Sequence, residues 1–298
     1  MNLKYFLPLL GFLPIITSCD NSLETDKQYE EEKSIESYIN SQKWIYTKGN
    51  GVYHVVQLQS YGYEVNYGDT ILFWYKGYTV KSPVLVFDTN IKSLAIEASL
   101  DTVVRKFEPA RAVVGSTPLL KGLNYGLLLC REGQKATLLF PSNLGYGDNY
   151  VGPISPWSPL AFDVEIIYLN GPGKAKEQTT LNSLNFTGYT QHLSGLYYKQ
   201  IIDTGLTRPA ETDKVFGSYT VKLINGAEVE TYSTTTEPIS ISDVSLPAIR
   251  IGFTLASVGG TINIIAPSPL AYGKKGNTKV SPYTPVEITI KLDSIKTN

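Results

Sequence analysis

The chain has 298 residues, and its 26 lysines and arginines against 27 aspartates and glutamates give a formal net charge of −1 at pH 7. The basic residues are not clustered, so a nucleic-acid partner is not expected. Because His54 and His192 are the only histidines, a zinc or iron centre built on histidine is not expected either, and neither is any other metal or cofactor.

Residues 1–19 have the pattern of a bacterial lipoprotein signal peptide. Lys4 supplies a short positive region, residues 6–16 form an apolar stretch too short to span a bilayer, and Cys19 follows small residues as in a lipoprotein processing site. We expect Cys19 to become the lipidated first residue of the mature chain and to anchor it to the outer membrane, on either face of that membrane. The alternative is an ordinary signal peptide with a coincidental cysteine.

Residues 20–43 are predicted to be a tether that leads to the first folded unit. Residues 21–32 are polar and acidic, which is typical of a solvated linker. Ile35, Tyr38 and Ile39 have helical spacing, so we expect a short helix that packs on the first domain.

Two blocks of sequence, 51–88 and 115–162, recur further along the chain. The first block returns 144 residues later and the second 126 residues later, as when Tyr146 recurs as Tyr272. The difference of 18 residues places an insertion of about that length between Asp88 and Gly115. Solenoid repeats have periods of roughly 20–50 residues, so this much longer period predicts two complete domains in tandem, at 44–170 and 181–298.

Within each copy the sequence alternates between strand and helix patterns. Residues 69–75, 135–140 and 162–167 are short β-rich runs. Each domain is therefore expected to be α+β, with an antiparallel β-sheet wrapping one short α-helix. In that helix Cys130 is expected to be a small buried hydrophobe and not a reactive thiol. The helical spacing is seen at Leu120, Leu123, Leu127 and Cys130, and again at Leu246, Ile249, Phe253 and Ala256.

Two segments fall outside the recurring blocks. The insertion, at about 91–108, has Leu100, Val103, Val104 and Phe107 at helical spacing, so a helix is expected there. It either covers extra surface or contacts a partner. Residues 171–180 are rich in turn formers and charge, and we expect them to be an exposed linker that proteases cut.

Both copies resemble FKBP-type peptidyl-prolyl cis-trans isomerase domains, and the resemblance covers almost the whole chain after residue 43. It rests on short segments that occur in the family's order and spacing. In the first copy these are GDTILFWYKG at 68–77, VFDTN at 86–90, LLKGL at 119–123, REGQKATL at 131–138, PSNLGYG at 141–147 and PISPWSPLAFDVEI at 153–166. In the second they are SGLYYK at 194–199, VGGTINIIAPSPLAYG at 258–273 and SPYTPVEI at 281–288. A lipoprotein signal before such domains is similar to envelope lipoproteins of the Bacteroidetes type.

The resemblance implies a pocket that speeds rotation about X-Pro bonds of polypeptides without a nucleophile or a metal. The Leu120 backbone N–H and the Tyr146 hydroxyl would donate hydrogen bonds to substrate carbonyls, and Asp88 would orient the Tyr75 hydroxyl. Leu127, Leu138 and Val164 are expected to be core residues only. The implied pocket of the first domain consists of Tyr75, Phe87, Asp88, Leu119, Leu120, Leu123, Tyr146, Ile154 and Phe162.

Both implied pockets depart from the family pattern. Leu123 stands where the family usually has tryptophan, and Ala110 falls near an expected aromatic wall. The first pocket should therefore be shallow and bind macrolide inhibitors such as FK506 poorly. In the second domain the offset of 144 makes Thr231 the counterpart of Phe87 and Tyr232 the counterpart of Asp88. That pocket is expected to be degenerate and to serve in binding or scaffolding; it would consist of Tyr219, Leu246, Ile249, Tyr272, Val280 and Ile288.

Three functions follow from these patterns. The first is a prolyl isomerase that assists the folding of exported envelope proteins. The second is a non-catalytic module that docks as a subunit of an outer-membrane assembly or secretion complex. The third is a holdase chaperone, since the 21 tyrosines suit adaptable interfaces. The intact Tyr75, Asp88 and Phe162 favour the first, whereas the degenerate second pocket and the tether favour the second.

Overall fold

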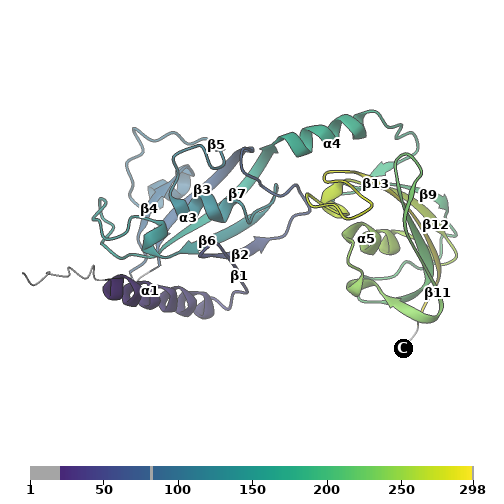
Figure 1. The fold of residues 1–298 in the computed structure, drawn as a ribbon, viewed down its shortest axis with the longest axis horizontal. Helices are drawn as coiled ribbons and strands as arrows, with labels where there is room; N and C mark the ends of the chain where they lie inside the picture. Colours follow the sequence, from purple (N-terminus) through teal and green to yellow (C-terminus); the bar gives the residue numbers. More distant parts are fainter. Residues whose placement is uncertain (1–20, 81–82, 297–298) are drawn as a thin grey trace, which may run out of the picture.

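The structure, a computed structural model, describes residues 21–80 and 83–296. It consists of two sheet-containing domains joined by helix α4 (Pro172–Asn182), with α1 (Asn21–Ser41) lying along the first domain (Figure 1). Cys19 and the signal pattern before it lie outside the described residues. Within the described part of the chain, no helix combines the length and the apolar character that crossing a membrane requires.

Each domain contains one antiparallel sheet, and the two sheets have the same strand order. In the first the order is β1 (Thr47–Gly49), β2 (Val52–Leu58), β6 (Lys135–Phe140), β7 (Leu160–Asn170), β3 (Thr70–Thr79) and β4 (Val86–Thr89), and β5 (Ala110–Val113) also pairs with β3. In the second it is β8 (Thr190–Gln191), β9 (Tyr197–Ile202), β12 (Thr261–Ala266), β13 (Val286–Ile295), β10 (Lys214–Leu223) and β11 (Glu228–Ser240). The predicted α+β class with two similar domains is confirmed.

One short helix packs on each sheet, α3 (Lys121–Leu127) in the first domain and α5 (Pro247–Leu255) in the second. Glycines let the helices approach closely: a Cβ at Gly126 would lie 2.7 Å from Leu138, and one at Gly252 would lie 2.3 Å from Ile290. Cys130 is buried as predicted, and burial raises the pKa of its thiol to about 12. It is therefore a core residue that stays protonated at neutral pH.

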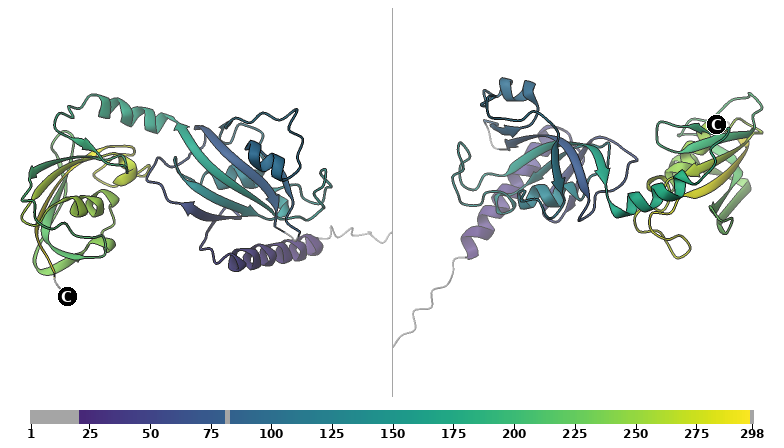
Figure 2. Two further views of the ribbon diagram at one scale, coloured as in Figure 1. Left: turned by 180° about the vertical axis from the view of Figure 1, so that it is seen from behind. Right: turned by 90° about the horizontal axis from the view of Figure 1, so that it is seen from above.

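The prediction that residues 21–32 form a solvated linker is wrong. They belong to α1, which is 21 residues long. The run is rich in Glu, Lys and Gln, which are strong helix formers. Further along the same helix, Ile35 and Ile39 are fully buried in a cluster with Tyr53 and Leu139 of the first domain. Two further views show α1 against the sheet of that domain (Figure 2), so α1 is part of the domain rather than a tether.

The insertion splits one strand into two. In the second domain β11 runs over 13 residues along β10, whereas in the first β4 and β5 pair with different parts of β3 and residues 90–109 separate them. The helix expected around Leu100 to Phe107 is wrong. The helix of this segment is α2 (Lys92–Glu97), which ends before Ser99, where φ is +55°. Val103 and Val104 are 90% and 79% exposed, so their spacing does not reflect a buried face.

The linker predicted at 171–180 is wrong as well. Residues 172–182 form α4, and its Glu177 is fully buried. At the start of α4, Lys174 donates to both carboxylate oxygens of Glu132 in the first domain, at 2.7 and 2.8 Å. Further along, Glu177 binds Ser268 of the second domain. Pro172 misled the prediction because proline at the first helical position opens a helix rather than breaking one.

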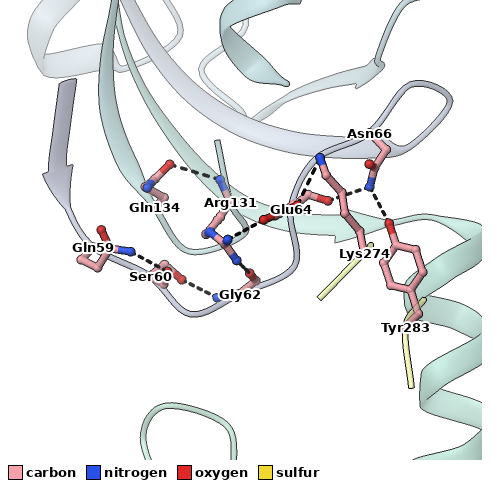
Figure 3. Close-up of polar contacts among 9 residues, drawn as sticks. All are labelled: Gln59, Ser60, Gly62, Glu64, Asn66, Arg131, Gln134, Lys274 and Tyr283. Carbon is pink, nitrogen blue, oxygen red and sulfur yellow. Dashed lines mark hydrogen bonds and ion pairs between the residues drawn. The ribbon is translucent and has the colours of Figure 1, made fainter. Parts of the chain in front are cut away.

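Direct contacts also join the two domains (Figure 3). Glu64 of the first domain binds Arg131 and, at 3.2 Å, Lys274 of the second domain. Asn66 donates a 2.8 Å hydrogen bond to the Tyr283 hydroxyl. Tyr283 packs against the first core and Tyr61 packs against the second core. Each domain thus contributes an aromatic side chain to its neighbour, and these contacts add to α4 in holding the domains together.

Candidate functional site

The structure brings the nine residues expected in the first pocket together around one hydrophobic core. Leu123, Ile154 and Phe162 are buried in that core. Five more side chains are half-buried against it, namely Tyr75, Phe87, Leu119, Leu120 and Tyr146. Asp88 joins the group through a hydrogen bond from Tyr75.

Five aromatic rings pack together at the expected pocket. Phe87 on β4 meets Phe162 on β7 edge-on, with ring centroids 5.7 Å apart and planes at 78°. Phe87 also meets Tyr146 edge-on at 6.3 Å. Phe162 in turn stacks on Phe140 at 5.9 Å and lies 6.2 Å from Tyr75. These are favoured aromatic geometries that make a stiff apolar wall.

Asp88 has two partners, one of which sequence reasoning missed. The Tyr75 hydroxyl donates to one carboxylate oxygen at 2.8 Å, and Arg105 pairs with the other. Burial, and then the charge of Asp88, raise the pKa of Tyr75, so its hydroxyl stays protonated. Arg105 comes from the insertion, and no sequence spacing linked it to Asp88. The insertion therefore contributes directly to the pocket.

Two hydrogen-bond donors of the first pocket have no acceptor. Among the described residues, no oxygen accepts a hydrogen bond from the Leu120 backbone N–H or from the Tyr146 hydroxyl. Burial, and then the nearby charge of Asp88, raise the pKa of Tyr146, which keeps its hydroxyl protonated. Both groups expected to bind substrate carbonyls are thus free to donate.

The sheet register corrects the expected counterparts of Phe87 and Asp88 in the second domain. Gly77 pairs with Asp88 on β4, and the counterpart of Gly77, Val221, pairs with Glu230 on β11. Glu230 therefore occupies the position of Asp88, and Val229 that of Phe87; Tyr232 and Thr231 do not. Residues on β3 precede their counterparts by 144 positions, but those on β4 precede theirs by 142. The turn between β3 and β4 is two residues longer than its counterpart, which a single offset overlooks.

Glu230 binds both tyrosines of the second pocket. It accepts hydrogen bonds from the Tyr219 hydroxyl at 2.8 Å and from the Tyr272 hydroxyl at 3.2 Å. Tyr232 stacks on Tyr219, with centroids 5.7 Å apart. Within the described residues, no lysine or arginine pairs with Glu230. The hydroxyl of Tyr272, the counterpart of Tyr146, thus already donates its hydrogen bond within the domain.

The remaining residues expected in the second pocket lie in the second core. Leu246, Ile249, Val280 and Ile288 are buried, and Tyr272 packs against them. With Val229 at the position of Phe87 and Ile288 at that of Phe162, two aromatic walls of the first pocket are replaced by aliphatic side chains. Among the side chains that the structure describes, no group of three or more His, Cys, Asp or Glu could hold a metal ion.

A model of the FKBP-type peptidyl-prolyl cis-trans isomerase family matches residues 62–167 and 205–293. FK506-binding protein 2 from Aspergillus oryzae is 35% identical over 107 residues, which are 36% of this chain and 69% of that protein. The FKBP-type peptidyl-prolyl cis-trans isomerase FkpA from Escherichia coli is 31% identical over 105 residues, 35% of this chain and 38% of that protein. The crystal structure of FkpA matches 42% of this chain and 57% of its own at 26% identity, with a TM-score of 0.35. The chain therefore belongs to the family of FKBP-type peptidyl-prolyl cis-trans isomerases and carries two FKBP domains.

Proposed function

We propose that the first domain catalyses the cis–trans isomerisation of X-Pro bonds in polypeptides, the reaction of its family, and that the second domain binds polypeptide without catalysing this reaction. The observation that supports this assignment best is the pair of unpartnered donors in the first pocket. The Leu120 N–H and the Tyr146 hydroxyl lie beside the aromatic wall of Phe87 and Phe162. The second pocket lacks both the wall and the free hydroxyl.

Such a pocket suits the chemistry of amide rotation. Resonance gives the X-Pro amide a barrier of about 18–20 kcal/mol and a charge separation that disappears when the bond twists. An apolar enclosure solvates the planar, more polar amide poorly, so it lowers the relative free energy of the twisted form. Donors such as the Leu120 N–H hold substrate carbonyls and fix the direction of twist. No bond is made or broken.

The second domain is assigned a binding role because of Glu230. Its carboxylate occupies the Tyr272 hydroxyl, so a substrate carbonyl has to compete with a charged acceptor. The aliphatic walls of the second pocket, Val229 and Ile288, are buried but offer a substrate less apolar surface than phenylalanine would. A polypeptide can still pack on the exposed ring of Tyr232.

We also propose that the reaction takes place in the cell envelope on exported proteins, with the protein anchored to the outer membrane through Cys19. The signal pattern of residues 1–19 supports this location. A non-catalytic docking role in an outer-membrane complex remains the second candidate. The fixed contacts between the two domains favour it, because they build one extended surface from both.

A pair of equivalent substitutions tests the catalytic assignment. Phe162→Ala should lower kcat/KM for X-Pro exchange in a short peptide by two- to a hundredfold, roughly 0.4 to 2.7 kcal/mol of transition-state stabilisation. Ile288→Ala, at the equivalent buried position of β13, should leave kcat/KM unchanged. Circular dichroism would establish that both variants fold. If the full chain shows no exchange on several peptides, the docking role replaces the catalytic one.

A further inference from the structure

The two domains share a contact that the recurring sequence blocks do not contain. In the first domain, Glu31 of α1 accepts hydrogen bonds from the backbone N–H of Ser142 at 2.6 Å and from its hydroxyl at 2.8 Å. In the second, Glu177 of α4 accepts the same two hydrogen bonds from Ser268. Each glutamate lies on the helix that precedes its domain.

Both contacts are buried. Glu31 and Glu177 are 3% and 0% exposed, and Ser142 and Ser268 are 2% and 1% exposed. No cation pairs with either glutamate among the described residues. A buried carboxylate is costly unless hydrogen bonds satisfy it. The serine supplies two such hydrogen bonds in each domain, and Tyr63 of the first domain supplies a further one to Glu177.

Each serine begins the turn that carries the pocket tyrosine. Ser142 begins a 3-10 helix (η1, Ser142–Leu144), and its carbonyl accepts hydrogen bonds from the N–H groups of Gly145 and Gly147, both at 2.8 Å. These two residues flank Tyr146. In the second domain the Ser268 carbonyl accepts from Ala271 at 2.9 Å and Gly273 at 2.8 Å, which flank Tyr272. Glutamate, serine and tyrosine turn thus form one continuous network in both copies.

We propose that Glu31 and Glu177 are positioning residues that set the pocket tyrosines through Ser142 and Ser268, so that α1 is a working part of the first site. Packing alone does not require Glu31, because Ile35 and Ile39 already attach α1 to the domain. Charge-assisted hydrogen bonds are shorter and stronger than neutral ones, and a pair on one serine fixes both the start of the turn and its direction. The kinetic consequence of this role rests on the isomerase activity proposed above.

The test uses the full chain and two independent readouts. Glu31→Gln keeps the size of the side chain but removes its charge. Hydrogen exchange of the amides from Ser142 to Gly147 should quicken at least tenfold while the rest of the sheet is unchanged. The value of kcat/KM should fall three- to tenfold. Glu32→Gln is the matched control, since Glu32 neighbours Glu31 on α1 but pairs with Lys48 at the surface; it should change neither readout.

A double-mutant cycle separates positioning from a general loss of stability. If Glu31 acts through the turn, Glu31→Gln should cost little further activity in the Tyr146→Phe background. Ser142→Ala removes one partner only and should reproduce part of both effects if Glu31→Gln does not fold. Unchanged exchange in the Ser142–Gly147 turn, or equal quickening throughout the domain, would overturn the role. If the wild type has no isomerase activity, hydrogen exchange of the Ser142–Gly147 turn alone tests whether Glu31 positions that turn.

Discussion

Asp88 and Glu230 occupy the same register position but serve different pockets. Asp88 is held by Tyr75 and Arg105, so the Tyr146 hydroxyl stays free. Glu230 is one methylene longer and reaches both Tyr219 and Tyr272. The longer side chain of Glu230 therefore accepts the hydrogen bond of Tyr272, whereas the hydroxyl of its counterpart Tyr146 remains available to a substrate. The second domain also has no insertion that could supply an arginine as a partner for Glu230.

At the residue scale, the family resemblance named nine side chains that the structure gathers around one core, but it did not name their polar partners. The apolar members lie in the short motifs that carry the resemblance. Arg105 could not be predicted, because its approach to Asp88 depends on how a 20-residue excursion folds back. Glu230 could not be placed either, because a turn differing by two residues shifts every later position.

His54 should make stability depend on pH. It is buried on β2, with its Nε2–H donating to Gln134 at 3.3 Å, and burial lowers its pKa from the ordinary value near 6.5. The neutral ring is thus favoured in the fold, so its contribution is present above pH 6.5 and is lost as pH falls below that value. The loss is at most about 1.4 kcal/mol per pH unit for one proton.

Urea unfolding at pH 7.5 and pH 5.5 measures this effect. The free energy of unfolding should drop between the two pH values in the wild type and drop less in His54→Gln, which keeps a polar side chain opposite Gln134. His192→Gln serves as the control, because that histidine lies in a turn at the surface of the second domain. Equal pH dependence in all three proteins would show that His54 does not titrate as described.

At the element scale, strands and core helices were predictable, and so was the second half of α1, where Ile35 and Ile39 pack on the first domain, whereas the first half of α1 and all of α4 were not. The core helices α3 and α5 have apolar residues at helical spacing that face a sheet. Residues 21–32 of α1 and the whole of α4 make their contacts with the domains through polar side chains such as Glu31, Lys174 and Glu177, which a periodicity of apolar residues does not detect. The sequence therefore predicted a solvated linker at 21–32 and an exposed linker at 171–180, where the chain has helices.

Replacing Gly173 on α4 by alanine should destabilise the protein, although this change usually stabilises a helix. Glycine to alanine inside a helix normally stabilises by up to about 1 kcal/mol. Here a Cβ would lie 2.4 Å from the ring of Tyr283, which also holds Asn66. Gly173→Ala should therefore displace the ring, weaken the contact between domains and lower the melting temperature. Thr179→Ala, on the exposed side of the same helix, should not lower it.

Calorimetry and limited proteolysis together check this contact. The wild type should resist cleavage within 171–182, and Gly173→Ala should be cut there faster. A higher melting temperature for Gly173→Ala, with unchanged cleavage, would mean that Tyr283 yields without cost and that the domain contact contributes little.

For the whole molecule, the tandem arrangement was predictable from the recurrence, but the contact between the domains was not. That contact uses Glu64, Asn66, Lys274 and Tyr283, which have no shared sequence pattern and meet only after both domains have folded. The two pockets therefore belong to one assembly and not to two domains that move independently on a flexible linker.

The position of this assembly in the cell depends on Cys19 in our account. Cys19→Ala should abolish lipid labelling and shift the protein from the membrane fraction to a soluble or unprocessed form, because the proposed acyl chains would be attached at Cys19. Fractionation and metabolic labelling with a fatty-acid probe measure this. Unchanged partitioning of the variant would contradict the proposed anchor.

Catalysed X-Pro exchange in the full chain, compared for two matched tyrosine variants, tests the central claim most directly. Tyr146→Phe removes the free donor of the first pocket and should lower kcat/KM by about two- to tenfold, the value of one hydrogen bond of about 0.5–1.5 kcal/mol. Tyr272→Phe removes a hydroxyl that already serves Glu230 and should leave kcat/KM unchanged. A larger loss from Tyr272→Phe than from Tyr146→Phe would contradict the assignment of catalysis to the first domain.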